Sequence, residues 1–413
     1  MADLLPETMH RHRHVIDTAR EVCGRFGFRA MATPIVEFTE VFARPLGASS
    51  DVVQKEMYTF QDRKGESLTL RPEATASVVR ALISNGLTQT LPQKFFYEGP
   101  MFRYERPQKG RMRQFHQIGV ELLGADRVAA DADVIIMADM ILKQLGVADK
   151  TTLYINTLGD GESRKRYSAA LVAYLKQYEG ELSPDSKTRL ANNPLRILDS
   201  KDAGDQKLLA DAPVMDAYLT GVAKGRFGEL ELMLEAMKIK YAINRQLVRG
   251  LDYYNDTVFE FTTDALGAQG AVVAGGRYNG LAELLGSKTP IPGIGWAAGV
   301  ERLAELISPP SLPKPDCLMI GMNRDQRTRL LPPANALRDK GLVMETAYAD
   351  KLAHALKEAD RKEVKLVVII GEDEMAKNTA LIRNMADGKQ SEVAQADLAR
   401  VVMQKIKEIG KHG

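Results

Sequence analysis

Five cations lie within the sixteen residues FRYERPQKGRMRQFHQ (102–117), and Glu105 is the only acid among them. The cations are Arg103, Arg106, Lys109, Arg111 and Arg113. The whole chain has 56 Lys and Arg against 54 Asp and Glu, a formal net charge of +2, so this positive charge is local. Such a cluster predicts a binding site for an anion. The alternative is a hairpin with one solvated face whose arginines pair with neighbouring acids. We favour the anion site, because a plain hairpin does not explain the clustering.

The same stretch predicts two strands joined by a loop, because Pro107 and Gly110 exclude a continuous helix. Residues two apart share a strand face. One face of the second strand, RQFHQIGVELLG, then carries Phe115, Gln117, Gly119 and Glu121, and the other is an apolar core face with His116, Ile118, Val120 and Leu122. A glycine between polar side chains predicts a hollow that a small ligand fills.

Three further stretches carry charged or aromatic groups beside glycines. LVRGLDYYNDTVFEF (247–261) has Arg249 and Asp252 before a strand, with Tyr253 and Tyr254 expected to point in opposite directions. Taken alone, we favour a structural explanation for it, an Arg–Asp pair and one buried tyrosine. AGGRYNGL (274–281) offers a glycine pair that by itself indicates only a turn. GIGWAAGVERL (293–303) predicts a glycine-rich strand running into a helix with Arg302, and it lacks the lysine of a P-loop.

The histidine-rich stretch HRHRH (10–14) raises the question of a metal site, because His10 and His14 share a helix face. For this stretch we favour a solvated helix face over a metal site. Neither Cys23 nor Cys317 has a neighbouring histidine, so no cysteine nucleophile is predicted.

The composition predicts a cytoplasmic globular protein of two or three domains. A chain of 413 residues is too long for one ordinary core. Two distant cysteines suit a reducing compartment and exclude a disulfide framework. The polar N-terminus MADLLPETMHRHRH does not resemble a secretory signal, and no apolar run reaches the roughly 20 residues that cross a bilayer.

The order of predicted elements indicates an antiparallel sheet, a helical insertion and a small α/β domain. The pattern predicts a helix over 6–26, a strand containing Pro34, and a strand that becomes a helix within 67–86. Helix-like segments fill about 160–240, and strand character returns at 246–264 and 271–281. After the proline-rich joint ISPPSLPKP (307–315), strands and helices alternate to the end of the chain.

These pieces, in this order, closely resemble those of bacterial histidyl-tRNA synthetases, which are class II aminoacyl-tRNA synthetases. The helix and strand ending at Pro34 resemble class II motif 1, FRYERPQKGRMRQFHQ resembles motif 2, and GIGWAAGVERL resembles motif 3. LVRGLDYY and AGGRYNGL resemble the two signatures peculiar to the histidine enzyme, and NPLRILDSKD a stretch of its insertion. YADKL and VVIIGEDEMAKNTALIRNM resemble its C-terminal domain, so the resemblance covers nearly the whole chain.

The resemblance implies an α+β class II catalytic domain over 1–310, an antiparallel sheet flanked by helices with a helical insertion at about 160–240. It also implies an α/β anticodon-binding domain over 311–413. The implied activity is the ATP-dependent activation of L-histidine to histidyl-adenylate, followed by transfer to the 3′ end of tRNA(His). The implied partners are histidine, ATP with Mg²⁺, tRNA(His) and a second copy of the chain, which would pair through the motif 1 region. No dedicated protein cage for a metal is implied.

The resemblance also implies roles for individual residues. The catalytic cations are Arg249 and Arg103. The histidine-binding residues are Glu73, Thr75, Gln117, Glu121, Arg249, Tyr253, Tyr254 and Tyr278. The ATP-binding residues are Arg103, Glu105, Arg111, Phe115 and Arg302. The residues that touch the tRNA acceptor end are Gln108, Lys109, Arg111 and Arg113.

Two alternatives bind ligands without forming an adenylate. One is the regulatory paralogue from histidine biosynthesis, which lacks the anticodon-binding domain and parts of the catalytic set. The other is a sensor module that binds uncharged tRNA beside a kinase domain. We favour the enzyme, because Arg103, Gln117, Arg249 and Arg302 are all present. The chain differs from the family in beginning at MADLLPET, without the usual short strand ending in Arg-Gly, and we expect this to weaken dimer packing only.

Overall fold

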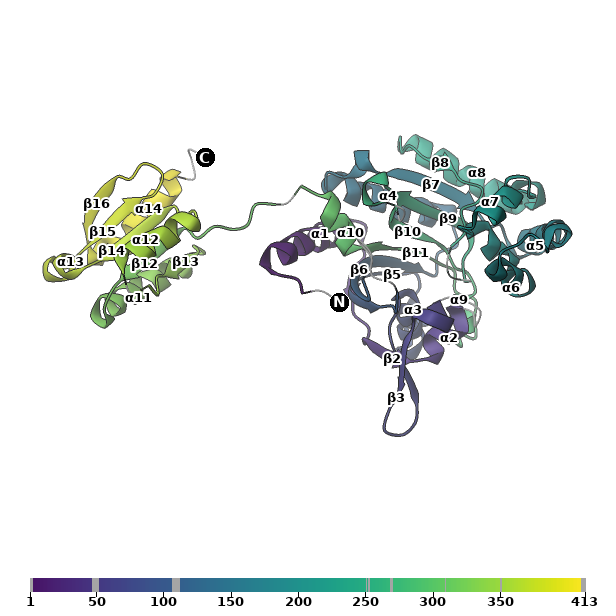
Figure 1. Cartoon of the computed structure of the whole chain (residues 1–413), viewed down its shortest axis with the longest axis horizontal. Helices are drawn as coiled ribbons and strands as arrows, with labels where there is room; N and C mark the ends of the chain where they lie inside the picture. Colours follow the sequence, from purple (N-terminus) through teal and green to yellow (C-terminus); the bar gives the residue numbers. More distant parts are fainter. Residues whose placement is uncertain are drawn as a thin grey trace. The chain divides into compact units, whose positions relative to one another are not determined.

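The computed structural model describes residues 3–46, 52–105, 112–249, 251, 253–267, 270–308, 310–349 and 351–409. Contacts divide the chain into two compact units, Met1–Pro310 and Ser311–Gly413 (Figure 1). No helix within the described ranges has both the length and the apolar character needed to cross a membrane.

The first unit is built on an eight-stranded sheet with the order β1-β5-β6-β11-β10-β9-β7-β8. Its middle strands are antiparallel, and only the outer pairs β1–β5 and β7–β8 are parallel. The strands are β1 Arg29–Met31, β5 Gln93–Phe102, β6 Gln114–Leu123, β11 Gly293–Gly299, β10 Ala271–Arg277, β9 Asn255–Thr262, β7 Thr152–Thr157 and β8 Ala242–Ile243. The predicted antiparallel sheet and the strand–loop–strand of residues 102–117 are confirmed.

Helices cover both faces of this sheet (Figure 1). Four of them share one hydrophobic core with the apolar face of β6: α1 Pro6–Arg25, α4 Val128–Gln144, α8 Gly221–Ala236 and α10 Val300–Leu306. The predicted core side chains Ile118, Val120 and Leu122 lie in this core. A second core on the opposite face contains α2 Glu40–Leu46, α3 Thr75–Ser84 and α9 Leu281–Leu284. Phe115 and Gln117 therefore face the side of the sheet that α3 covers, and they are free to contribute to a site there.

Helix α1 follows its sequence pattern closely. Val15, Ala19, Val22 and Cys23 recur at helical spacing and are fully buried. Pro6 lies at the start, where its missing N–H is not needed, and Gly27 adopts a positive φ of 80° just after the end. The predicted helix over 6–26 is confirmed.

The single strand predicted around Pro34 is wrong. The chain forms two short strands, β1 and β2 Val36–Phe38, which belong to different sheets, with Pro34 between them. Proline has no N–H for a ladder and restricts the residue before it, so the strand is interrupted there. Strand β2 joins β4 Ser67–Leu70 and β3 Tyr58–Gln61 in a three-stranded antiparallel sheet that projects from the unit (Figure 1). The turn from strand to helix predicted within 67–86 is confirmed by β4 and α3.

The predicted helical insertion is confirmed. It contains α5 Gly161–Leu175, α6 Pro184–Asn192 and α7 Ala203–Ala210, followed by α8, and it has a hydrophobic core of its own. Asp205 of α7 connects separate segments of this insertion. This buried carboxylate accepts hydrogen bonds from the Ser183 N–H and from the hydroxyls of Ser183, Ser186 and Ser200 at 2.5–2.9 Å.

The second unit has a five-stranded sheet with the order β13-β12-β14-β15-β16. Its parallel strands are β12 Cys317–Gly321, β13 Met344–Thr346 and β14 Leu366–Ile370, and its antiparallel strands are β15 Thr379–Asn384 and β16 Gln390–Ala394. The helices are α11 Arg324–Arg338, α12 Leu352–Arg361, α13 Glu372–Lys377 and α14 Leu398–Ile409. The predicted alternation is confirmed, whereas the hairpin β15–β16 was not predicted from the sequence.

Candidate active site

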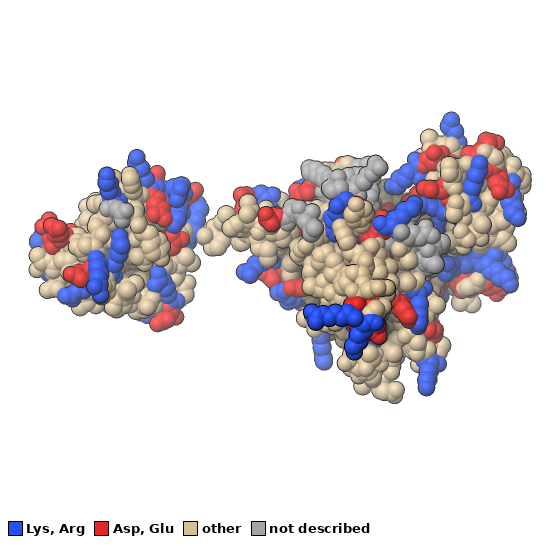
Figure 2. Space-filling model, turned by 60° about the horizontal axis from the view of Figure 1, so that its bottom comes forward, with Lys and Arg blue, Asp and Glu red and all other residues tan. Residues whose placement is uncertain are grey.

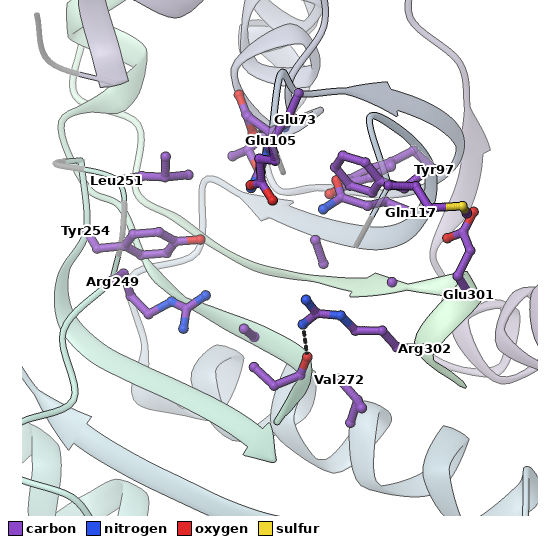
Figure 3. Close-up of a pocket in the computed structure, with 18 of the residues that line it drawn as sticks. Glu73, Tyr97, Glu105, Gln117, Arg249, Leu251, Tyr254, Val272, Glu301 and Arg302 are labelled. Atoms are coloured by element: carbon purple, nitrogen blue, oxygen red, sulfur yellow. Dashed lines mark hydrogen bonds between the residues drawn. The ribbon is translucent and has the colours of Figure 1, made fainter. Parts of the chain in front are cut away.

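A cavity of about 260 Å³ opens on the face of the large sheet opposite α1. Its wall comes from segments far apart in the chain: the turn before α3, strands β5, β6, β10 and β11, the segment before β9, and the start of α10. The cavity brings together ten residues for which the family resemblance implied a role in binding histidine or ATP: Glu73, Thr75, Arg103, Glu105, Phe115, Gln117, Arg249, Tyr253, Tyr254 and Arg302. Figure 3 shows Arg249 and Arg302 projecting into this space from opposite sides.

Three guanidinium groups surround the cavity, each held by its own support. Arg103 Nε donates to the carbonyl oxygen of Pro72 at 2.9 Å, and its guanidinium lies 5.5 Å from the ring centre of Phe115. Arg302 Nη1 donates to the carbonyl oxygen of Ala271 at 2.5 Å. Arg249 Nη1 donates to Glu260 Oε2 at 3.1 Å. A cavity with three such donors fits a ligand with several negative charges.

Three polar atoms of residues in the cavity wall are buried without a hydrogen-bond partner among the described residues. They are the Tyr97 hydroxyl oxygen, Gln117 Oε1 and Arg249 Nε. Buried polar groups in folded proteins are nearly always satisfied, so unpaired ones in a cavity wall indicate ligand contacts. Gln117 Oε1 is an acceptor, Arg249 Nε is a donor and the Tyr97 hydroxyl can be either, which fits a ligand carrying both an ammonium group and an anionic group.

Glu73 is held rigidly at the start of α3. Its carboxylate accepts hydrogen bonds from the backbone N–H groups of Thr75 at 2.7 Å and Ala76 at 3.0 Å, as an N-terminal cap does. Burial raises the pKa of Glu73, and these two amide donors and Arg103 oppose the rise. The side chain therefore offers a fixed acceptor at the cavity wall.

Glu121 and Tyr278 lie behind the wall and do not line the cavity. Glu121 is fully buried and accepts hydrogen bonds from the Thr75 hydroxyl at 2.6 Å and from the Tyr278 hydroxyl. Burial raises the pKa of Glu121 from 4.5 to about 8. Thr75 thus connects the cavity to a deeper polar layer that also contains Tyr278.

The hollow predicted at Gly119 is wrong, because protein atoms fill it. A Cβ atom on Gly119 would lie 2.3 Å from the Tyr97 hydroxyl and 2.6 Å from the carbonyl oxygen of Trp296. The glycine is needed for this close packing, and Tyr97 itself lines the cavity. Tyr97 was not predicted from the sequence, although it lies opposite Gly119 in the register of β5 and β6.

The expectation that Tyr253 and Tyr254 point in opposite directions, with one of them buried, is also wrong. Both are buried, both line the cavity, and their ring centres are 4.7 Å apart. They precede β9, so strand alternation does not apply to them. The partner expected for Arg249, Asp252, lies outside the described residues. The structure instead pairs Arg249 with Glu260.

The glycine pair of AGGRYNGL packs against protein. A Cβ atom on Gly275 would lie 2.2 Å from the carbonyl oxygen of Gly295, and one on Gly276 would lie 2.9 Å from the Tyr254 ring. The next residue, Arg277, is fully buried and forms an ion pair with Asp131 of α4. This pair anchors the end of β10, directly before Tyr278.

Of the four loop residues predicted to touch the tRNA acceptor end, the structure describes Arg113. Gln108, Lys109 and Arg111 lie outside the described residues. Arg113 lies at the edge of that loop and outside the cavity, with its guanidinium 4.1 Å from the ring centre of the exposed Tyr104. Glu301 was also not predicted from the sequence. It lines the cavity beside Arg302 and accepts hydrogen bonds from His116.

The family model for histidyl-tRNA synthetase matches residues 1–303, which include every segment of this cavity. The chain belongs to the histidyl-tRNA synthetase family. The model for an anticodon-binding domain matches residues 318–405, in the second unit. The regulatory alternative is disfavoured, since that group lacks such a domain.

The chain is also similar to individual members of the histidyl-tRNA synthetase family. The chain is 51% identical over 397 residues to the histidine–tRNA ligase of Rhodospirillum rubrum, covering 96% of this chain and 95% of the relative. It is 52% identical over 394 residues to that of Gluconacetobacter diazotrophicus, covering 95% and 94%. The crystal structure of apo histidyl-tRNA synthetase from S. aureus matches with a TM-score of 0.81 at 33% identity, covering 97% of this chain and 98% of that one.

Proposed function

We propose that each group of residues in the cavity has a separate role in the reaction of a histidine–tRNA ligase. The chain is an ATP-dependent enzyme of this class. In the first step the carboxylate of histidine attacks the α-phosphorus of ATP, forming histidyl-adenylate and releasing pyrophosphate. In the second, the terminal ribose hydroxyl of tRNA(His) attacks the carbonyl carbon and releases AMP. A phosphate oxygen of the adenylate accepts the hydroxyl proton.

The first step requires two anions to approach each other. Arg103 and Arg249 reduce their repulsion by binding the α-phosphate and the substrate carboxylate, with Arg249 as the catalytic cation. Charge stabilisation by fixed donors is usually the largest contribution to such a step. The observation that carries this assignment is the convergence of Arg103, Arg249 and Arg302 on one cavity. Arg249 also has a buried Nε that lacks a partner among the described residues.

ATP would occupy the side of the cavity nearest α10. Phe115 and Arg302 would enclose the adenine ring, Arg302 and Arg111 would bind the outer phosphates, and Glu105 would contact the nucleotide. Mg²⁺ prefers oxygen ligands and would share the phosphate charge. Glu105 is a carboxylate in the cavity wall and would be a suitable ligand for this Mg²⁺. The other ligands would be phosphate oxygens and water.

Histidine would occupy the side nearest α3. Glu73, Thr75 and Gln117 would bind its ammonium group, and Tyr253 would contribute to the wall. We retain Glu121 and Tyr254 as the residues that bind the ring nitrogens, with Tyr278 lining the same pocket. Because Glu121 and Tyr278 lie behind the wall, this requires the Thr75 hydroxyl to turn away from Glu121 as the imidazole enters. A site built on such polar contacts rejects analogues that lack them by about 10⁴–10⁵.

The tRNA would be bound at both of its ends. Gln108, Lys109, Arg111 and Arg113 would touch the acceptor end, and the second unit would bind the anticodon. Arg113 and Tyr104 form a cation–aromatic pair at the edge of the loop, which suits contact with phosphate or an unstacked base. We propose a cytoplasmic location, because charged tRNA(His) is used there in protein synthesis.

We propose a homodimer that pairs through the motif 1 region, which ends at Pro34, and through the projecting three-stranded sheet that follows it. Large apolar side chains are exposed there: Ile35, Val36, Phe38 and Phe60. Figure 2 shows a wide area with few charged side chains across the middle of the first unit, on the side where this sheet projects. Contiguous exposed apolar side chains of this kind mark protein–protein contacts.

Charging of a tRNA(His) transcript with each amino acid in turn tests the function. We expect histidine to be attached in an ATP-dependent reaction, and no other amino acid to exceed background. If a folded sample binds histidine and ATP but charges nothing, the regulatory or sensor alternatives replace the enzyme.

A further inference from the structure

Two histidines and a glutamate meet behind the ATP side of the cavity. His12 comes from α1, His116 from β6 and Glu301 from α10, and one ligand atom from each lies within 4.8 Å of the other two. His116 is on the face of β6 opposite Phe115 and Gln117. Figure 1 shows α1 and α10 on this side of β6, and the two helices pack against each other. Within the described ranges, no other group of three or more His, Cys, Asp or Glu side chains meets this spacing.

The existing hydrogen bonds join Glu301 to His116, and none of them includes His12. Glu301 accepts hydrogen bonds from His116 Nδ1 at 2.8 Å and from the His116 backbone N–H at 2.9 and 3.0 Å. His12 is 2% exposed, and its ring lies edge-on to His116 with centroids 5.7 Å apart. In the described part of the chain, neither ring nitrogen of His12 makes a hydrogen bond. The solvated face expected for the HRHRH stretch is therefore wrong for its central histidine.

His12 is placed to act as a ligand, because one of its ring nitrogens lies within 4.8 Å of ligand atoms of His116 and Glu301 in the interior of the protein. A neutral imidazole has a lone pair on one ring nitrogen, and this lone pair can bind a metal ion.

We propose that His12, His116 and Glu301 form a site for a divalent transition ion of the Zn²⁺ type. Two imidazoles and one carboxylate are a common zinc ligand set, and three protein ligands leave a position for water. Nitrogen-rich sites favour such ions over Mg²⁺ and Ca²⁺, which prefer oxygen. The site is therefore distinct from the Mg²⁺ that accompanies ATP.

The geometry requires only small movements. Tetrahedral coordination at about 2.0–2.1 Å places ligand atoms about 3.4 Å apart. His116 Nδ1 and Glu301 Oε1, now 2.8 Å apart, would separate by about 0.6 Å to reach that spacing. A pair at the 4.8 Å limit would close by about 1.4 Å. Side-chain rotation covers both changes, and the bound ion would connect α1, β6 and α10.

Titration of the whole chain with Co²⁺ and Zn²⁺, with Mg²⁺ present throughout, tests the proposal. We expect one ion per chain at this site, a Co²⁺ absorption spectrum typical of tetrahedral nitrogen and oxygen ligands, and a Zn²⁺-dependent rise in melting temperature. His12→Phe keeps an aromatic ring in the same packing, and Glu301→Gln keeps an acceptor for His116. Both variants should bind at least about 10-fold more weakly, because each removes one ligand.

His14→Ala is the matched control, since His14 lies on the same helix but is exposed. It should bind as the wild type does. The proposal is overturned if the wild type shows no saturable binding. It is also overturned if folded His12→Phe and Glu301→Gln keep wild-type affinity, or if His14→Ala alone abolishes binding.

Discussion

The ion pair between Arg249 and Glu260 sets the orientation of the proposed catalytic cation. Arg249 Nη1 lies 3.1 Å from Glu260 Oε2, and each side chain is about one-fifth exposed. Glu260 comes from the rigid strand β9 and does not line the active cavity. It lines a separate cavity of about 260 Å³ on the insertion side of Arg249. Glu260 is therefore a positioning residue, and Glu260→Gln should slow adenylate formation without touching the substrates.

The size of the effect follows from the type of bond and its exposure. A hydrogen bond between charged groups contributes about 1.5–3 kcal/mol. Partial exposure screens this pair, so we expect a loss of about 1–2 kcal/mol. If that loss falls on the transition state, the rate constant for adenylate formation drops about 5- to 30-fold. The KM values for histidine and ATP should change less than this rate constant.

Single-turnover formation of histidyl-adenylate measures this rate constant directly. Glu162→Gln is the matched control, because Glu162 pairs with Arg166 on the exposed surface of α5. It should leave the rate unchanged. In an Arg249→Ala background, Glu260→Gln should cause little further loss, because both changes remove one interaction. A Glu260→Gln rate within twofold of wild type, or full additivity with Arg249→Ala, would refute the positioning role.

Three other predictions concern stability. Asp131→Asn removes the buried counter-charge of the Arg277 guanidinium and leaves the largely exposed Asp126, 3.6 Å away, so denaturant unfolding should show a loss of about 3–5 kcal/mol. Although burial acts in the opposite direction, hydrogen bonds from the serines around Asp205 lower its pKa from 3.8 to about 2. Asp205→Asn should therefore cost about 1–3 kcal/mol above pH 4, and the difference from wild type should shrink as the pH falls toward 2. Burial raises the pKa of Glu121 from 4.5 to about 8. Between pH 4.5 and 8 the folded state therefore becomes less stable, relative to the unfolded state, as the pH rises. Between pH 4.5 and 8, the free energy of unfolding of Glu121→Gln should rise relative to that of wild type by up to about 1.4 kcal/mol per pH unit. A difference that stays constant with pH would contradict the raised pKa of Glu121.

Local pattern was enough to predict the strands and helices that carry the cavity. The alternation of β6 assigned Ile118, Val120 and Leu122 to the core and Phe115 and Gln117 to the opposite face, since strand periodicity depends only on neighbouring residues. The prediction failed at Tyr253 and Tyr254, because they lie before β9 and the regular backbone of that strand is interrupted by Asp256, which has a positive φ of 45°.

Contacts between distant segments could not be predicted in this way. Tyr97 fills the space at Gly119 from the neighbouring strand, and that pairing is set by the sheet register. His12 meets Glu301 only because α1 packs on α10, although 289 positions separate them in the sequence. Each of these outcomes depends on tertiary packing, which a single sequence without the folded backbone does not reveal.

The most direct test of the central claim is the exchange of pyrophosphate into ATP by wild type and Arg249→Ala. With Mg²⁺ and histidine present, we predict rapid exchange by the wild type, none with other amino acids, and a loss of exchange in folded Arg249→Ala. Exchange that persists in Arg249→Ala would remove the catalytic cation from the account. No exchange by a folded wild type would contradict the adenylate-forming function itself.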